Sequence, residues 1–268
     1  MSGGLAMAAI PFYRRSLEML PVELLYEIQF YAASASLPLT CKRLYHIFQS
    51  APPTIKAEYI LGRYELFPYR KRCLITQALR YPLCNEDVLE ALLRQPDCPP
   101  LSESGDRPSL PAHLFRHLSA PGGGIWRERH HPLPFLNYLY NHPRIPQPDP
   151  NSHHGYPLTR AVLLEFLPLI HFLLEKGASP AEKNALAVFI AIRKKDLSLV
   201  KLLVEPSPAP AGNARTRTKR RRVPDRLKPS PGMLNTAVKC KAMDIVDWLI
   251  KEKDVVPTME TVRLTTVK

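Results

Sequence analysis

The sequence lacks the features that secreted, membrane-spanning and catalytic proteins require. Its five cysteines are odd in number and widely spaced between Cys41 and Cys240. They therefore predict no disulfide framework and favour a reducing compartment, the nucleus or the cytoplasm. The apolar run over residues 5–12 is too short to span a bilayer and has no basic region before it. We expect an intracellular protein with neither a signal peptide nor a membrane helix.

Motifs for catalysis, metal binding and cofactor binding are missing as well. Gly122–Gly124 lacks the Gly-Lys-Ser/Thr ending of a phosphate-binding loop, and no nucleophile elbow, kinase signature or paired-carboxylate motif occurs. His113 and His117 are four residues apart, but no close cysteine pair or His-Glu partner accompanies them as zinc motifs require. We expect no enzymatic activity, no cofactor, no metal and no small-molecule substrate.

Proline and positive charge are abundant instead. The 29 prolines among 268 residues are about twice the usual share of roughly 5%. They favour many helix ends and irregular connections over a continuous sheet. With 45% hydrophobic residues the chain can form one or two globular units with a true core, and its formal net charge is +13. We predict an all-α protein.

Two apolar stripes lie close together between residues 20 and 48. In the first, Leu20, Leu24 and Ile28 recur at helical spacing, and Pro21 and Glu23 suit the start of a helix. In the second, one helical face is predicted to carry Leu37, Cys41, Leu44 and Phe48, with Lys42 and Arg43 toward solvent. Two such short helices bury little by themselves, so both stripes must pack against something.

The pattern L-P-x-E-L-L-x-x-I followed by L-x-C-K-R-L, over residues 20–44, resembles an F-box. This short helical motif docks on the Skp-type adaptor of a cullin ubiquitin ligase, so the resemblance implies a substrate-recognition subunit. The residues that the resemblance assigns to adaptor contact are Leu20, Pro21, Leu24, Leu25, Ile28, Leu39, Cys41 and Leu44. In the alternative interpretation, this segment is only the N-terminal helical cap of a larger helical domain.

An internal repeat follows in the second half of the chain. Residues 156–180, 185–205 and 233–257 each contain a small alanine, Ala161, Ala191 or Ala237, followed by a leucine-rich apolar run. Each copy is predicted to be a helix pair in which the alanine lets the two helices approach. The next copy in the array would cover its apolar stripe. Residues 73–95 and the run PFLNYLYNH predict further, more divergent helix pairs.

These copies resemble ankyrin repeats in Pro157–Leu158, in the three alanines and in Glu175–Ala178. The combination with an F-box-like motif resembles a class of fungal proteins. Such arrays bind a protein target through turns and first helices, here near Thr159, Arg193, Lys194, Lys195, Asp196, Lys239 and Lys241. The alternatives are an unrelated all-α bundle and an ankyrin-type scaffold with no role in ubiquitin transfer.

A basic, proline-rich insertion at residues 206–232 separates the last two copies. Ala161 and Ala191 are 30 residues apart, whereas Ala191 and Ala237 are 46 apart. The insertion holds eight basic residues and one acidic residue, which is +7 of the formal +13, and its prolines predict a disordered loop. Its run Lys219, Arg220, Arg221 and Arg222 resembles a nuclear-import signal read by an import carrier. Nucleic-acid binding through residues 215–228 and a solvated loop without function are the alternatives.

The expected organisation has six segments. Residues 1–15 form a flexible N-terminus, 16–50 the F-box-like motif, 51–155 a divergent helical region, 156–205 two ankyrin-like repeats, 206–232 the insertion, and 233–268 a last repeat. Within the last segment, residues 258–268 are expected to open a further repeat that the chain does not complete.

Overall fold

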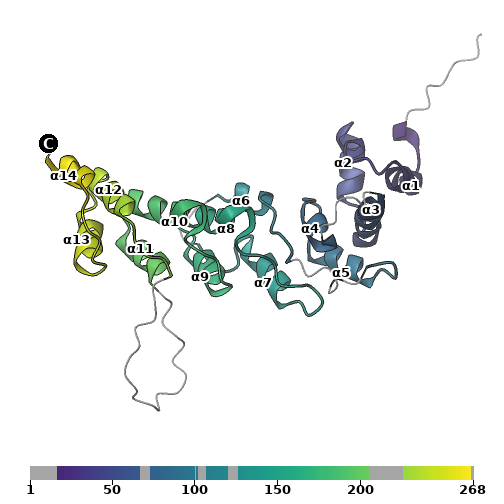
Figure 1. Ribbon diagram of the computed structural model, residues 1–268. Coiled ribbons are helices and arrows are strands. Elements are labelled where there is room, and N and C mark those ends of the chain that lie inside the picture. The colour runs from purple at the N-terminus through teal and green to yellow at the C-terminus, as the bar shows by residue number, and fades with distance from the viewer. Residues whose placement is uncertain are drawn as a thin grey trace, which may run out of the picture. The chain divides into compact units, whose positions relative to one another are not determined.

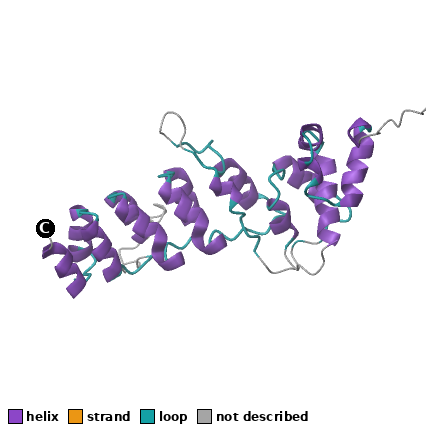
Figure 2. Cartoon of the chain, turned by 90° about the horizontal axis from the view of Figure 1, so that it is seen from above, coloured by secondary structure: helices purple, strands orange, loops and turns teal. Residues whose placement is uncertain are grey.

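A computed structural model describes residues 17–66, 73–99, 101, 107–119, 126–205 and 226–266 (Figure 1). Every regular element in these ranges is a helix, and the only strand-like pairing among them is an isolated bridge between Ser109 and Asp149. Figure 2 shows this helical character along the described chain. The prediction of an all-α fold is confirmed. The chain divides into two compact units, unit 1 over residues 1–100 and unit 2 over residues 101–268.

The boundary between the units falls inside the segment 51–155 that the sequence suggested as one divergent region. The described elements of unit 1 are η1 (Leu17–Met19), α1 (Val22–Ala32), η2 (Leu37–Leu39), α2 (Lys42–Gln49), α3 (Pro53–Leu66), α4 (Leu74–Leu79) and α5 (Glu86–Arg94). The central element is α3, which packs against α1, α4 and α5. Helix α1 therefore shares a core with α3, which also packs on α4 and α5.

The C-terminal end of α1 is held by side chains of two helices. Ala33 adopts a left-handed conformation with φ of 45°, and its N–H donates back to the last turn of the helix. From α3, the guanidinium of Arg63 donates to the carbonyl oxygen of Ala33, where a cation also complements the helix dipole. The Gln29 side-chain amide of α1 donates to the carbonyl oxygen of Ser34 at 2.7 Å. The Arg63 bond ties the end of α1 to α3, whereas the Gln29 bond holds the chain just beyond the helix.

Unit 2 contains α6 (His113–Arg116), α7 (Leu133–Asn141), α8 (Ser152–Leu163), α9 (Leu167–Glu175), α10 (Glu182–Arg193), α11 (Leu197–Val204), α12 (Pro231–Lys239), α13 (Met243–Lys251) and α14 (Met259–Thr266). Figure 1 shows α6, α8, α10, α12 and α14 in one row and α7, α9, α11 and α13 in a second row. Within the first row, α8 packs on α6 and α10, and α12 packs on α10 and α14. The predicted helix pairs are therefore present, and the first helix of each pair packs on the first helix of the next pair.

The three predicted alanines occupy the same structural position. Each lies in the last turn of the first helix of its pair, is fully buried, and accepts the backbone N–H that closes the helix. These bonds run from Phe166 to Ala161 at 2.9 Å, from Asp196 to Ala191 at 3.3 Å, and from Ala242 to Ala237 at 3.0 Å. The residue before each donor, Glu165, Lys195 or Lys241, has φ between 53° and 60°. This is the Schellman arrangement, repeated three times.

The first helices of two pairs also begin in the same way. His153–Gly155 and Lys183–Ala185 form left-handed turns 30 residues apart. At Gly155 the φ angle is +70°, and a Cβ atom built there would lie 2.7 Å from the Cβ of Glu182. Only glycine allows the two entry turns to approach this closely. The third pair has no such turn, because Pro231 opens α12 in an ordinary helical conformation.

The extent of the basic insertion requires a correction. Residues 206–225 lie outside the described residues, but residues 226–230 are placed and α12 begins at Pro231. The backbone N–H of Arg226 donates to the carbonyl oxygen of Val204 at 2.9 Å, and its guanidinium donates to that of Leu202 at 3.3 Å. The prediction of disorder through residue 232 is therefore wrong at this end, because Arg226 caps the last carbonyls of α11.

Candidate interaction surfaces

The residues predicted to contact an adaptor separate into exposed and buried groups. Leu24 and Leu39 are 43% and 73% exposed, and Pro21 is exposed as well. Leu20, Ile28 and Cys41 are half-buried. By contrast, Leu25 and Leu44 are 0% and 2% exposed. A partner cannot reach these two leucines in this conformation, so their assignment to direct contact is corrected: they form the core beneath the exposed residues.

The second predicted apolar face is divided between two elements. Leu37 belongs to the short helix η2, and α2 begins only at Lys42. Cys41 is the N-cap of α2, and its Sγ atom accepts the backbone N–H of Leu44 at 3.4 Å. The expectation that Leu37 and Cys41 continue the helical face of Leu44 and Phe48 is therefore wrong, because the cap interrupts the helix.

Sequence analysis missed several exposed apolar side chains beside the predicted set. Met19 is 77% exposed, and Leu17, Phe30, Tyr31, Tyr45 and Leu66 are exposed as well. Among the described residues of unit 1, every exposed large apolar side chain lies within residues 17–66 and none lies in the segment 73–99. Their spacing carries no distinct signal, since apolar residues at helical period are expected in the core as often as on a contact surface.

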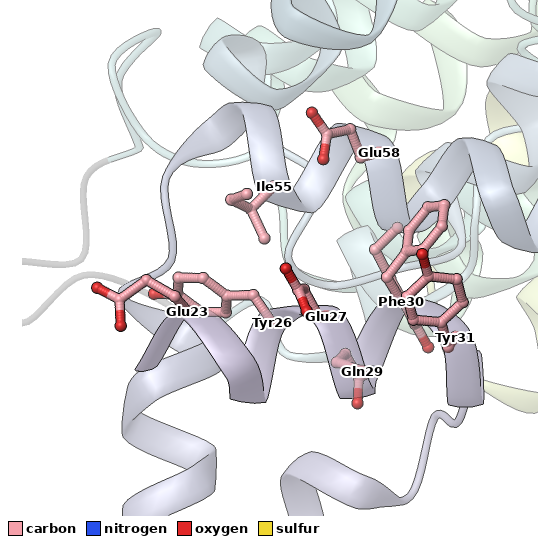
Figure 3. Close-up of a pocket in the computed structure, with 9 residues that line it drawn as sticks. Glu23, Tyr26, Glu27, Gln29, Phe30, Tyr31, Ile55 and Glu58 are labelled. Atoms are coloured by element: carbon pink, nitrogen blue, oxygen red, sulfur yellow. The ribbon is translucent and has the colours of Figure 1, made fainter. Parts of the chain in front are cut away.

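A cavity of about 420 Å³ opens between α1 and α3 (Figure 3). It is lined by Glu23, Tyr26, Glu27, Gln29, Phe30, Tyr31, Ile55, Glu58 and Tyr59. Burial raises the pKa of the Tyr59 hydroxyl, and the neighbouring Arg63 guanidinium partly opposes this shift. The sequence does not predict this cavity, because its two walls come from separate helices and their pairing depends on tertiary contacts.

Most residues predicted to contact a target lie at the turns that end the first helices of unit 2. Arg193, Lys195 and Lys241 are exposed, and no ion pair to another described residue involves them. Lys194 pairs with Glu165 of the preceding turn at 2.6 Å. We call the three segments 163–167, 193–197 and 239–243 the turn edge.

The remaining predicted target residues have local partners. Lys239 pairs with Glu260 of α14 at 3.1 Å. The Asp196 carboxylate caps α11 by accepting the backbone N–H of Leu199 at 3.0 Å. Thr159 lies inside α8, not at the turn edge, and its hydroxyl donates to the carbonyl oxygen of Gly155 at 3.0 Å. The structure therefore aligns the lysines and Arg193 along one edge and leaves Thr159 apart from them.

The predicted import signal, Lys219–Arg222, lies outside the described residues and stays a prediction. Of the basic residues downstream of it, Arg226 is tied to α11, and its partial burial lowers the pKa of its guanidinium. Lys228 is exposed. Any nucleic-acid contact through residues 215–228 would therefore involve a chain that is anchored at Arg226.

The histidines noted in the sequence do not gather into a metal centre. In the part of the chain that the structure describes, no group of three or more histidine, cysteine, aspartate or glutamate side chains is placed to hold a metal ion. Burial lowers the pKa of His113, and the nearby His131 adds to that shift. A second proton is therefore disfavoured on the His113 imidazole.

None of the described helices combines the length and the apolar character needed to cross a membrane. Comparison of the chain with protein-family models, with curated proteins and with solved structures gave no match. The functional argument therefore depends on the chain's own residues and surfaces.

Proposed function

We propose that the protein is a substrate-recognition adaptor of a cullin ubiquitin ligase. Residues 17–50 dock on a Skp-type adaptor, and the helix pairs of unit 2 bind the target protein as a divergent ankyrin-like array. The observation that carries the first half is the concentration of exposed apolar side chains in residues 17–66 of unit 1. Isolated exposed apolar residues are ordinary, but a run of them on consecutive short elements is typical of an interaction site.

The direct contacts in this proposal are Leu24 and Leu39, with Pro21 and the additional Met19. All four are exposed and lie on η1, α1, η2 or their connections. Leu25 supports them from the core of the unit. Burying the exposed leucines against a partner would stabilise the complex by about 25 cal/mol for each Å² of apolar surface removed from water.

The target half of the proposal uses the turn edge of unit 2. Arg193, Lys195 and Lys241 leave unpaired positive charge along successive turns, whereas Lys194 and Lys239 are paired with glutamates. A positive edge attracts an acidic partner. It raises the association rate constant more than it raises the equilibrium affinity. We therefore infer a target segment rich in aspartate, glutamate or phosphorylated residues.

The test is calorimetric binding of the full chain to a purified Skp-type adaptor. Leu24→Asp and Leu39→Asp place a charge on the exposed contact set and should each weaken binding by about 30-fold or more, the effect of a central interface residue. The matched control is Leu163→Asp. Leu163 is 41% exposed, similar to the 43% exposure of Leu24, but it lies in unit 2. Leu25→Asp is unsuitable, since it would unfold the unit.

Three results would contradict the adaptor assignment. A folded wild-type chain that shows no heat of binding would leave a scaffold whose N-terminal helices serve only their own unit. Equal losses for Leu24→Asp and Leu163→Asp would show that the contact does not involve the F-box-like helices. Survival of the cellular function after deletion of residues 1–50 would also favour the scaffold.

The positive charge of the turn edge supports nucleic acid as a second candidate partner. Exposed Arg193, Lys195 and Lys241 together with the basic residues 215–222 offer several phosphate contacts. Binding of this kind weakens steeply with salt, with a slope of about −0.7 to −0.9 per phosphate neutralised. Titration of a labelled single-stranded oligonucleotide at several salt concentrations measures this slope. A flat salt dependence, or full affinity after Lys219–Arg222 are replaced by alanine, would exclude this partner.

A further inference from the structure

Exposed apolar side chains of unit 2 gather on the turn edge. Among the described residues of unit 2 that precede Ile250, the exposed large apolar side chains are those of Leu163, Leu167 and Met243. They are 41%, 48% and 60% exposed, and all three belong to the turn edge. Single exposed apolar residues scattered over a surface need no explanation, but their confinement to one edge is typical of an interaction surface.

The repeat places apolar residues at equivalent positions along this edge. In each pair, the first residue of the second helix follows the buried alanine by six positions. These first residues are Leu167 of α9, Leu197 of α11 and Met243 of α13. Leu197 is half-buried, and the other two are exposed. We call these three residues the apolar ladder.

Positive charge lies beside the apolar ladder in the second and third pairs. The left-handed residue of each turn is Glu165, Lys195 or Lys241, two positions before the ladder residue. In the first pair, Lys194 neutralises Glu165 at 2.6 Å. The other two segments of the turn edge carry five basic residues and one acidic residue. Exposed lysines such as Lys183 also occur elsewhere, so the charge identifies a site only together with the apolar ladder.

The spacing of the ladder limits the conformation of a bound segment. The first helices α8, α10 and α12 pack on one another, and packed helices lie about 8–10 Å apart. In the polyproline II conformation, every third side chain returns to the same face after about 9.3 Å. In a β-strand, side chains of one face recur at about 6.7 Å or 13 Å. In an α-helix, about 9 Å corresponds to six residues, which turn the side chain away by about 240°.

We infer that the turn edge binds a target segment in the polyproline II conformation. Every third residue of this segment is apolar and contacts the apolar ladder, and the acidic residues between them face Arg193, Lys195 and Lys241. Unfolded chains already populate this conformation, so the segment loses little freedom on binding. The inference rests on the target half of the proposed function and adds the conformation and register of the bound segment. A nucleic-acid strand would use the positive charge but gain nothing from the apolar ladder.

The test compares two peptides of identical composition by fluorescence anisotropy with the full chain. One is Leu-Glu-Glu-Leu-Glu-Glu-Leu and the other is Glu-Leu-Glu-Leu-Glu-Leu-Glu, both with blocked ends and the same dye. Their charge and apolar content are equal, and both are too short for a stable helix in water. Only the period differs. We expect the three-residue period to bind about tenfold more tightly, the effect of burying one further leucine.

One substitution tests the apolar ladder. Met243→Gln should weaken binding of the three-residue-period peptide about fivefold and leave the two-residue-period peptide unchanged. The matched control is Ile250→Gln, because Ile250 is 39% exposed on the same helix α13 but lies outside the turn edge.

A second substitution tests the charge. Lys195→Gln should weaken binding of both peptides about threefold, the scale of an exposed charge pair. The matched control is Lys183→Gln. Both lysines are exposed and have left-handed backbones, with φ of 60° and 50°, but Lys183 lies in the first turn of α10 and Lys195 follows its last turn.

The outcomes separate this inference from the proposed function. Equal affinities for the two peptides, or equal losses in Met243→Gln and Ile250→Gln, would overturn the register and leave adaptor binding untouched. Binding of neither peptide by a chain that binds the Skp-type adaptor would do the same. A single-stranded oligonucleotide that displaces the peptide, and that Lys195→Gln weakens but Met243→Gln does not, would identify nucleic acid as the occupant. A preference for the three-residue period without adaptor binding would support this inference and contradict the ligase role.

Discussion

The two units treat their apolar residues in different ways. In unit 2 each helix pair buries its stripe on the next pair, and the alanines at the closest approach are fully buried. The exposed large apolar residues among its described positions are Leu163, Leu167 and Met243 at the turn edge, Ile250 on α13, and Val256, Met259 and Val262 further along the chain. Unit 1 gathers its helices around α3 and leaves Leu24 and Leu39 exposed in the middle of its sequence. Unit 2 therefore buries the stripes of its helix pairs, whereas unit 1 leaves apolar side chains of α1 and η2 exposed.

Ion pairs between neighbouring helix pairs are found in unit 2. In unit 2, lysines and glutamates of neighbouring pairs meet across the stack, as Lys194 and Glu165 do at 2.6 Å. In unit 1, Glu27 and Glu58 face a cavity that no cation lines. Ion pairs on exposed surfaces contribute little stability, about 0–1 kcal/mol each. The ion pairs of unit 2 therefore add little to its stability.

The largest expected effect is loss of unit 1 in Leu25→Asp. A carboxylate at this fully buried site has no partner, which should destabilise the unit by about 4 kcal/mol or more. The reporter is Cys84, a buried thiol whose burial raises its pKa to about 12, so that it resists alkylation while the unit is folded. Mass spectrometry after iodoacetamide treatment should show Cys84 modified in Leu25→Asp but protected in Leu24→Asp.

These two variants test the distinction between the buried Leu25 and the exposed Leu24, because they place the same charge at adjacent residues. Protection of Cys84 in both variants would show that Leu25 is not a core residue. Modification in both would show that Leu24 supports the fold and is not a free contact.

The next effect is overpacking of unit 2 in Ala191→Leu. The larger side chain has no space between the first and second helices. We therefore expect the free energy of unfolding to fall by about 3 kcal/mol. Ala181→Leu is the control, since Ala181 is exposed at the N-cap of α10 and alanine and leucine are equally poor caps there. Urea unfolding followed by circular dichroism should show a lower midpoint for Ala191→Leu alone, and equal midpoints for the two variants would contradict the close approach.

A smaller effect is expected for Gly155→Ala at the entry turn of α8. The new Cβ would meet the Cβ of Glu182 at 2.7 Å, in a backbone conformation with φ of +70°. Gly177→Ala separates the two causes, because Gly177 also has positive φ but no atom within 4 Å of its built Cβ. We expect the free energy of unfolding to fall by about 1 kcal/mol in Gly177→Ala, from backbone strain alone, and by about twice that in Gly155→Ala. Thermal unfolding measures both, and a larger loss at Gly177 would contradict the packing argument.

Much of unit 2 was predictable because its signals are local. The alanine and the leucine run recur within one helix pair, so a period near 30 residues already places Ala161 and Ala191 in equivalent sites. The residues that sequence reasoning misplaced depend on tertiary contacts. Periodicity sets Leu24 and Leu25 side by side and cannot tell which one faces the core, because that is decided by the position of α3.

Capping and insertion geometry were unpredictable for a related reason. The face from Leu37 to Phe48 has helical spacing, but Cys41 caps α2 and interrupts it. The insertion has the composition of a free loop, but Arg226 finds carbonyl acceptors at the end of α11. The cavity joins Glu27 to Glu58, 31 residues later, and no periodic pattern links them.

The smallest expected effect concerns the last helix, which polar side chains attach to the array. The Thr261 hydroxyl of α14 donates to the Asn235 side-chain oxygen of α12 at 2.5 Å, and both residues are buried. Thr261→Val keeps the volume but leaves that acceptor without a donor and the backbone N–H of Thr258 without the hydroxyl that accepts it at 3.0 Å, which should cost about 1–2 kcal/mol. We expect faster amide hydrogen exchange in α14 alone. Thr236→Val is the control, since its hydroxyl donates only to Gly232 within its own helix. Unchanged exchange in α14 would mean that apolar contact holds this helix, as it holds the rest of unit 2.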